Sequence, residues 1–187
     1  MYRRSINTLL TVALLQVMAA GTAVARSGAF TGDVQDVRAA LGRFHSFDQA
    51  LAAGYRAAGE PCVASPEGTM GVHAANSAIL ASGEIDPLNP PILVYLPRED
   101  GSLRLVAAEW FAAALANTPD GPRPWFEATP PPDGFFNPAP SVLGKTFDGP
   151  MPGHNPRMPW HYDLHAWLFE ANPAGTFVPF NPAISCP

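Results

Sequence analysis

The chain has 187 residues, of which 47% are hydrophobic and 14% are charged, and its formal net charge is −5. Nucleic acid is excluded as an expected partner, because a phosphate backbone requires a basic surface and acidic residues outnumber basic ones here. The apolar fraction is high enough to build one buried core, and the length fits a single domain of about 100 to 200 residues.

The first 25 residues have the pattern of a cleavable export signal. Arg3-Arg4 precedes an apolar run over 9–20, and Ala23-Val24-Ala25 has the small-x-small pattern of a cleavage site. Loss of residues 1–25 would leave one globular domain, 26–187, whose formal charge falls from −5 to −7 because two arginines are removed. The apolar run is shorter than the roughly 18 to 20 residues of a spanning helix. We therefore expect a secreted or periplasmic protein with no transmembrane anchor after cleavage.

A helical segment is predicted between residues 31 and 58, where apolar residues recur at helical spacing: Val34, Val37, Leu41 and Phe44. Thr31 or Asp33 is the expected N-cap. A second helical piece over 47–57 follows Ser46, whose hydroxyl is expected to cap it. The two pieces predict a helical hairpin or a bent helix.

Residues 90–113 predict a β-hairpin. An apolar run begins at Ile92, Glu99-Asp100-Gly101 forms a turn, and a second strand runs from Leu103. Strand alternation places Glu109 on one face with four apolar residues: Leu103, Leu105, Ala107 and Phe111. A buried carboxylate needs a hydrogen bond, an ion pair or a metal, so Glu109 is a candidate site residue.

Prolines are dense between residues 117 and 160, and no helical or strand period is visible there. Several aromatic residues predict that this segment folds back as a cover: Trp125, Phe126, Phe135, Phe136 and Phe147. His161–Phe169 is predicted as a core strand, although a short helix also fits. The elements together predict an α+β domain with an N-terminal helical pair, a small antiparallel sheet and a long Pro-rich covering loop.

The two cysteines of the chain, Cys62 and Cys186, both belong to the predicted exported part. An oxidising compartment favours a disulfide between them, and two free or intermolecular thiols are the alternative. Such a bridge would close most of the domain and stabilise it by about 4 to 5 kcal/mol.

A histidine pair gives the strongest functional signal. His161 and His165 are four residues apart, which places both imidazoles on one face of either a strand or a helix. With Glu109 they would supply the two-histidine, one-carboxylate set that is used by many metal centres, and His73 is the fourth candidate. We therefore expect a divalent metal bound by His73, Glu109, His161 and His165.

Further candidate ligands, direct or supporting, are Asp163, His154, Met70 and Met158. Met70, Met151 and Met158 each precede a histidine by three residues. Thioether with imidazole suits copper outside the cytoplasm, although methionine more often fills gaps in a core. Zinc or another divalent ion is favoured, because neutral imidazole and carboxylate suit these ions, and copper is the alternative.

Other functions stay open. The same histidines and Glu109 could instead form a hydrogen-bonded network, with Glu109 paired to Arg104, Arg157 or a backbone amide. A second function class is a non-catalytic small-molecule-binding or cell-envelope structural protein with an aromatic pocket: Trp110, Trp125, Trp160 and Trp167. The sequence lacks the His-Glu-x-x-His and Gly-x-Ser-x-Gly motifs of common hydrolases, so it does not establish an enzyme, and the small molecule it would bind stays unknown.

Several short patterns resemble those of a family of uncharacterised secreted bacterial proteins. They are Ala53-Gly54-Tyr55, Cys62, Gly71-Val72-His73, Leu105-Val106-Ala107-Ala108-Glu109-Trp110, His161-Tyr162-Asp163-Leu164-His165-Ala166-Trp167, Asn172-Pro173-Ala174-Gly175, and Asn181-Pro182 ending at Cys186. The likeness covers most of the predicted exported part. It implies a domain of that kind and carries no activity with it.

Overall fold

The computed structural model describes residues 33–57 and 61–187, so the predicted export signal lies outside the described residues. The helical elements are α1 (Val34–Leu41), the 3-10 helix η1 (Gly42–His45), α2 (Phe47–Ala52) and α3 (Ser77–Ser82). The strands are β1 (Arg56–Ala57), β2 (Val63–Ser65), β3 (Gly68–Ala75), β4 (Ile92–Pro97), β5 (Leu103–Ala113), β6 (Leu115–Ala116), β7 (Arg123–Pro124), β8 (Ser141–Val142), β9 (Lys145–Thr146), β10 (Asp148–Met151) and β11 (His161–Ala166). This content confirms the α+β class.

The N-terminal helices follow the sequence pattern with two differences. Asp33 caps α1, since its carboxylate accepts hydrogen bonds from the amides of Gln35 and Asp36. The expectation that Ser46 caps α2 is wrong, because its side chain makes no capping hydrogen bond within the described part of the chain. The second helix is also shorter than predicted. Gly54 has a φ of +97° and ends the helical path, so the chain continues as β1 where helix was expected.

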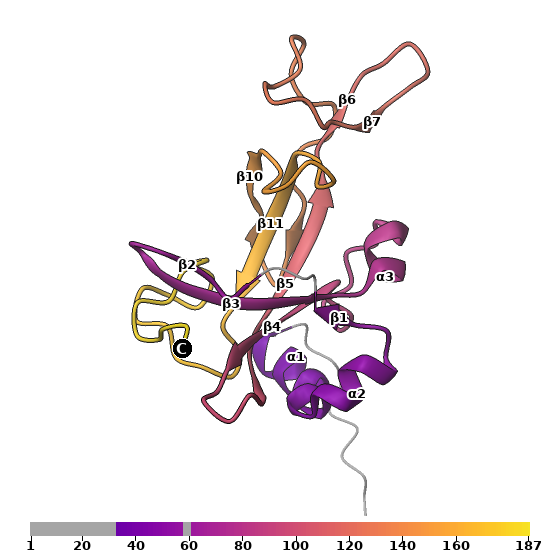
Figure 1. Ribbon diagram of the computed structural model, residues 1–187. Coiled ribbons are helices and arrows are strands. Elements are labelled where there is room, and N and C mark those ends of the chain that lie inside the picture. The colour runs from indigo at the N-terminus through magenta and orange to yellow at the C-terminus, as the bar shows by residue number, and fades with distance from the viewer. Residues whose placement is uncertain (1–32, 58–60) are drawn as a thin grey trace, which may run out of the picture.

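One antiparallel sheet forms the body of the protein (Figure 1). Among the described residues, seven strands pair in the order β1-β3-β4-β5-β11-β10, with β2 also paired to β3. The predicted hairpin is confirmed as β4 and β5. The two longest strands, β3 and β5, carry three of the predicted site residues: Met70, His73 and Glu109.

A β-bulge corrects the predicted alternation of β5. Val94 pairs with Ala107 but Tyr95 pairs with Leu105, so Val106 is an extra residue in β5. Leu103 and Leu105 therefore pack in the same core cluster as Trp110, on the face opposite Glu109. The prediction that they share a face with Glu109 is wrong, because one inserted residue reverses which side each later residue faces.

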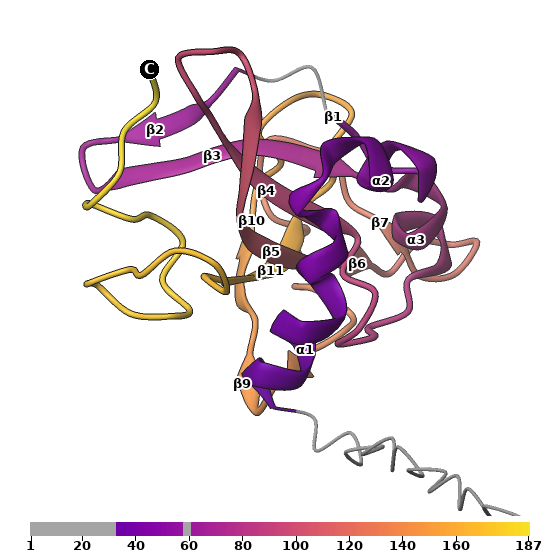
Figure 2. The same cartoon turned by 90° about the horizontal axis from the view of Figure 1, so that it is seen from below.

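The two faces of the sheet are filled differently. On one face α1, η1 and α2 pack their apolar side chains against the strands (Figure 2). The buried Tyr95 hydroxyl donates to the carbonyl of Phe44, and the Tyr55 hydroxyl donates to the carbonyl of Pro90, which ties the helical segment to the sheet. The opposite face carries a smaller apolar cluster around Val106 and Trp167, and next to it lies the polar site described below.

The Pro-rich segment contains more strand than the sequence predicted. Its β7 pairs with β6, which lies just before the segment, its β8 pairs with β9, and β10 extends the main sheet beside β11. Phe147 is buried and Phe135 packs against the main core, whereas Phe126 and Phe136 are exposed. The part around β6 and β7 extends away from the body of the sheet (Figure 1).

The C-terminal tail returns to the β2-β3 hairpin. Cys62 and Cys186 form the predicted disulfide, and the amide of Thr69 donates to the carbonyl of Asn181. A disulfide of this kind fits an oxidising, extracytoplasmic location. Over the described residues, every helix is too short or too polar to cross a bilayer.

Candidate metal centre

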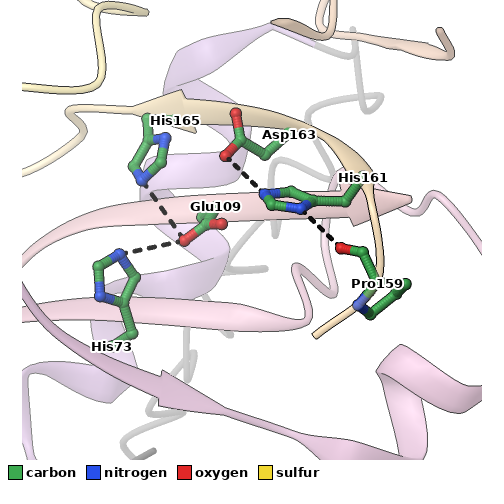
Figure 3. A network of polar contacts seen from close by, with 6 residues as sticks. All are labelled: His73, Glu109, Pro159, His161, Asp163 and His165. Atoms are coloured by element: carbon green, nitrogen blue, oxygen red, sulfur yellow. Dashed lines mark hydrogen bonds and ion pairs between the residues drawn. The ribbon is translucent and has the colours of Figure 1, made fainter. Parts of the chain in front are cut away.

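Strand pairing brings three predicted ligands together on the face of the sheet opposite α1, η1 and α2. Glu109 on β5 lies directly opposite His165 on β11. Glu109 also lies opposite Ile92 on β4, and Ile92 lies opposite Ala75 on β3. His73 is two residues before Ala75, so its side chain emerges on the same face and points toward the Glu109 carboxylate (Figure 3).

The two imidazoles approach the same carboxylate oxygen. His73 Nε2 lies 3.3 Å and His165 Nε2 lies 3.4 Å from Glu109 Oε2. One potential ligand atom from each residue lies within 4.8 Å of the other two, so this cluster could hold a metal ion. Atoms bound to zinc at about 2.0 to 2.2 Å in a tetrahedral arrangement are about 3.3 to 3.6 Å apart, which matches both contacts.

Burying the polar side chains of this cluster costs free energy unless their polar atoms are bonded. Glu109 is 3% and His165 is 2% exposed. Neither ring nitrogen of His165, nor His73 Nδ1, has a hydrogen-bond partner among the described residues. Buried polar atoms are nearly always bonded, and those that are not call for a missing ion or water.

The histidines are held in the state that binds metals. Burial is the main cause that lowers the pKa of His73 from 6.5 to about 3, with smaller contributions from the neighbouring His165 and His154 and an opposing one from Asp163. Burial likewise lowers the pKa of His165, against the opposing effect of Asp163. Both imidazoles are therefore neutral near pH 7, and a neutral imidazole offers its lone pair to a metal.

His161 lies outside this cluster. Its side chain points to the same face, as predicted, but an extended strand rises about 3.3 Å per residue, so His161 is about 13 Å along β11 from His165. Instead, His161 Nε2 lies 3.6 Å from Asp163 Oδ2, and its Nδ1 lies 3.1 Å from the Pro159 carbonyl oxygen. His154 packs edge-on against the His161 ring, with ring centroids 5.5 Å apart.

A cavity of about 570 Å³ opens beside the cluster, and His73, Glu109 and His165 form part of its wall. Most of the remaining wall is apolar, including Ile92, Phe111 and Met158. Met70, His154 and Asp163 line both this cavity and a neighbouring one of about 600 Å³. A ligand position on the metal would therefore be reachable from the cavity.

The four tryptophans of the predicted aromatic pocket all hydrogen-bond to the backbone. Among the described residues, the wall of the cavity beside the cluster contains none of the four. Each indole N–H donates instead to a backbone carbonyl: Trp110 to Asp86, Trp125 to Thr129, Trp160 to Glu127 and Trp167 to Val178. These bonds fix connecting segments, which is a structural role.

No family model, curated protein or solved structure matches this chain. What the site does is therefore argued from its own geometry. Two imidazoles and one carboxylate converge, with Glu109 and His165 buried and His73 half-buried, and they form a three-ligand set with one side open to a cavity. Three protein ligands with an accessible fourth position are typical of zinc sites that exchange a water or a small molecule.

Several residues of the cavity wall carried no signal in the sequence. Ala75, Ser77 and Leu80 come from the end of β3 and from α3, and neither element was predicted. The eight residues of β3 include two glycines and few β-branched side chains, so propensity does not mark them as a strand. The Asn76 side chain caps α3 by accepting from the amides of Ala78 and Ile79, and this cap was the available signal.

Proposed function

We propose that this is an exported protein that binds one zinc ion through His73, Glu109 and His165 and keeps a fourth ligand position open to the adjoining cavity. The observation that carries the proposal is the approach of two neutral imidazole nitrogens to one buried carboxylate oxygen, at 3.3 and 3.4 Å. Neutral imidazole with carboxylate suits zinc.

Export is supported by two independent features. The first 25 residues have the charge, apolar run and small-x-small motif of a cleavable signal. The Cys62–Cys186 disulfide suits an oxidising compartment, because cytosolic reductants keep most thiols free. A secreted or periplasmic zinc protein is consistent with both.

The cavity supports a small molecule as the partner of the bound zinc. Its volume of about 570 Å³ lies in the range of ligand sites, about 300 to 1,000 Å³, and its wall combines apolar side chains with a few polar groups. An oxygen donor on such a molecule would take the open zinc position. The geometry supports binding of this kind and names no reaction.

Metal analysis tests the proposal directly. Protein purified from its own compartment should contain at least about one zinc per chain. The His165→Ala variant should lose the zinc bound at this cluster. His45→Ala is the matched control, because His45 is an exposed histidine that packs on Phe169, away from the cluster. A protein that stays metal-free when zinc is added would contradict the proposal.

A further inference from the structure

We propose that the cavity beside the cluster binds an apolar dicarboxylate, with one carboxylate on the zinc ion and the other paired with Arg157. This inference rests on the zinc site proposed above and names the class of small molecule that the site takes. Three features carry it: a guanidinium without a partner in the cavity wall, the charge left on the bound ion, and an otherwise mostly apolar wall.

Arg157 is the one arginine of the described residues whose side chain has no partner. Its guanidinium makes no hydrogen bond or ion pair and lies over no aromatic ring within the described part of the chain. Every other arginine in this part pairs with a carboxylate, lies over a phenylalanine ring or donates a hydrogen bond. They are Arg104 and Arg123, Arg38 and Arg43, and Arg56 and Arg98, in that order. The Arg157 guanidinium is therefore available to an anionic ligand.

Arg157 belongs to the wall of the cavity of about 570 Å³ that the three zinc ligands also line. It is exposed, and among the described residues it is the only lysine or arginine of that wall. The two acids of the wall, Glu109 and Asp163, are each 3% exposed. The fixed charge that an entering molecule can touch is therefore the guanidinium of Arg157.

A guanidinium of this kind selects a carboxylate. Its planar fork of N–H donors matches the two oxygens of a carboxylate and makes two parallel hydrogen bonds with them. A phosphate carries about −1.5 to −2 charges, which a cluster of basic side chains would neutralise better. Within the described part of the chain the wall offers Arg157 alone, so a singly charged carboxylate is the better match.

The zinc end of the cavity favours a second carboxylate. Zinc carries two positive charges, and the two histidines bind it as neutral imidazoles, so the Glu109 carboxylate leaves one positive charge on the site. Charge that is buried without compensation costs free energy. A ligand carboxylate in the open position neutralises the site, and carboxylate oxygens are ordinary zinc ligands.

The rest of the wall favours an apolar body between the two charged groups of the ligand. Most of it is apolar, with contributions from Leu80 of α3, Ile92 of β4 and Phe111 of β5. Methylene groups that join two carboxylates would bury apolar surface against these side chains, which the hydrophobic effect favours. A short dianion without methylene groups would gain nothing from this wall.

Isothermal calorimetry on the zinc-loaded protein tests this inference. The probes are glutarate, adipate, pimelate and suberate, and the reference is hexanoate, which has a single carboxylate. At least one dicarboxylate should bind about tenfold more tightly than hexanoate, the low end for a charge-assisted hydrogen bond because Arg157 is exposed. Arg157→Gln should remove this preference and leave the affinity for hexanoate unchanged. Arg98→Gln is the matched control and should keep the preference, because Arg98 is exposed in the β4-β5 turn, outside this wall.

The outcomes separate this inference from the zinc site, because bound zinc is counted in each protein before the titration. A zinc-loaded wild type that binds no dicarboxylate more tightly than hexanoate overturns the inference and leaves the zinc site. The same follows if Arg157→Gln keeps the preference, and a wild type that binds no zinc overturns both proposals. Arg157 is exposed and its side chain makes no bond within the described residues, so Arg157→Gln should fold, which thermal unfolding checks.

Discussion

Glu109 is the side chain on which the proposed zinc site depends most. It is the only carboxylate in the cluster of three, and both imidazoles approach its Oε2. A carboxamide of the same shape cannot supply a negative charge to the ion. We therefore expect Glu109→Gln to weaken zinc binding by about 100-fold or more while the protein still folds.

Calorimetric titration with Zn²⁺ measures this change. Glu99→Gln serves as the control, since Glu99 is an exposed acid in the turn of the β4-β5 hairpin. An unchanged affinity in Glu109→Gln would show that zinc binds elsewhere.

The raised pKa of Tyr55 predicts that the protein loses stability in alkaline solution. Burial raises the pKa of Tyr55 from 10.0 to about 12, with Arg43 opposing the shift, and its hydroxyl donates to the Pro90 carbonyl. A raised pKa in the folded state means that the unfolded chain loses its proton first. The contribution is therefore complete below about pH 10 and is lost as the pH rises toward 12.

Urea unfolding between pH 8 and 11 checks this expectation. Tyr55→Phe should be less stable at pH 8, because the hydrogen bond is absent, and its stability should fall less steeply above pH 10. Identical pH dependence in both proteins would contradict the assignment.

At the level of single residues, part of the candidate cluster could be predicted from the sequence. Glu109 and His165 could be predicted because a buried acid and a histidine on an alternating strand are visible in the sequence. His161 was assigned to the same ion because it shares the strand face. Sharing a face does not imply sharing a site, since four residues of extended chain span about 13 Å.

Gly71 shows how one element constrains the site. It has a φ of +122°, and a Cβ there would lie 2.6 Å from the backbone oxygen of Tyr95 on the paired strand β4. We expect Gly71→Ala to lower the free energy of unfolding by about 2 to 4 kcal/mol, because backbone strain and a main-chain clash add. Because His73 is two residues away, zinc affinity should fall as well.

Gly101→Ala separates the two causes. Gly101 also has a positive φ, +80°, but a Cβ there meets nothing within 4 Å. Its loss of stability, measured by urea unfolding, should be limited to the backbone cost of about 1 to 2 kcal/mol. Equal losses in the two variants would show that the close approach of β3 to β4 is unimportant.

At the level of elements, strands with a regular hydrophobic pattern could be predicted from the sequence, and strands without one could not. The β4-β5 hairpin and β11 were predicted because their apolar residues alternate or run together. The bulge at Val106 leaves no mark in the pattern, because apolar residues occupy both faces around it. β10 contains Asp148-Gly149-Pro150-Met151, which has low strand propensity and is held by its pairing with β11.

At the scale of the whole molecule, the disulfide is a covalent link between distant parts of the chain. It joins residues 124 apart and ties the C-terminal tail to the segment before β2. Closing so long a loop reduces the conformational entropy of the unfolded chain. The Cys62→Ser, Cys186→Ser double variant should therefore lose about 4 to 5 kcal/mol of stability. Urea unfolding of both proteins measures the difference, and a loss below about 1 kcal/mol would contradict this account.

The global arrangement could be predicted in part. One possible cysteine pairing, an N-terminal helical pattern and an alternating hairpin were enough to give the α+β class. The position of His73 could not be derived, because it depends on β3 lying next to β4, and such long-range pairing has no local signature. The proposed zinc site therefore depends on the assembled sheet more than on any one motif.

The central claim is that a zinc ion lies among His73, Glu109 and His165. A crystal structure of the zinc-loaded protein, with anomalous data collected on both sides of the zinc absorption edge, tests it most directly. The account predicts a zinc peak about 2.0 to 2.2 Å from His73 Nε2, His165 Nε2 and a Glu109 carboxylate oxygen. Crystals with no zinc peak at this position, in which the imidazoles donate hydrogen bonds to Glu109, would contradict it.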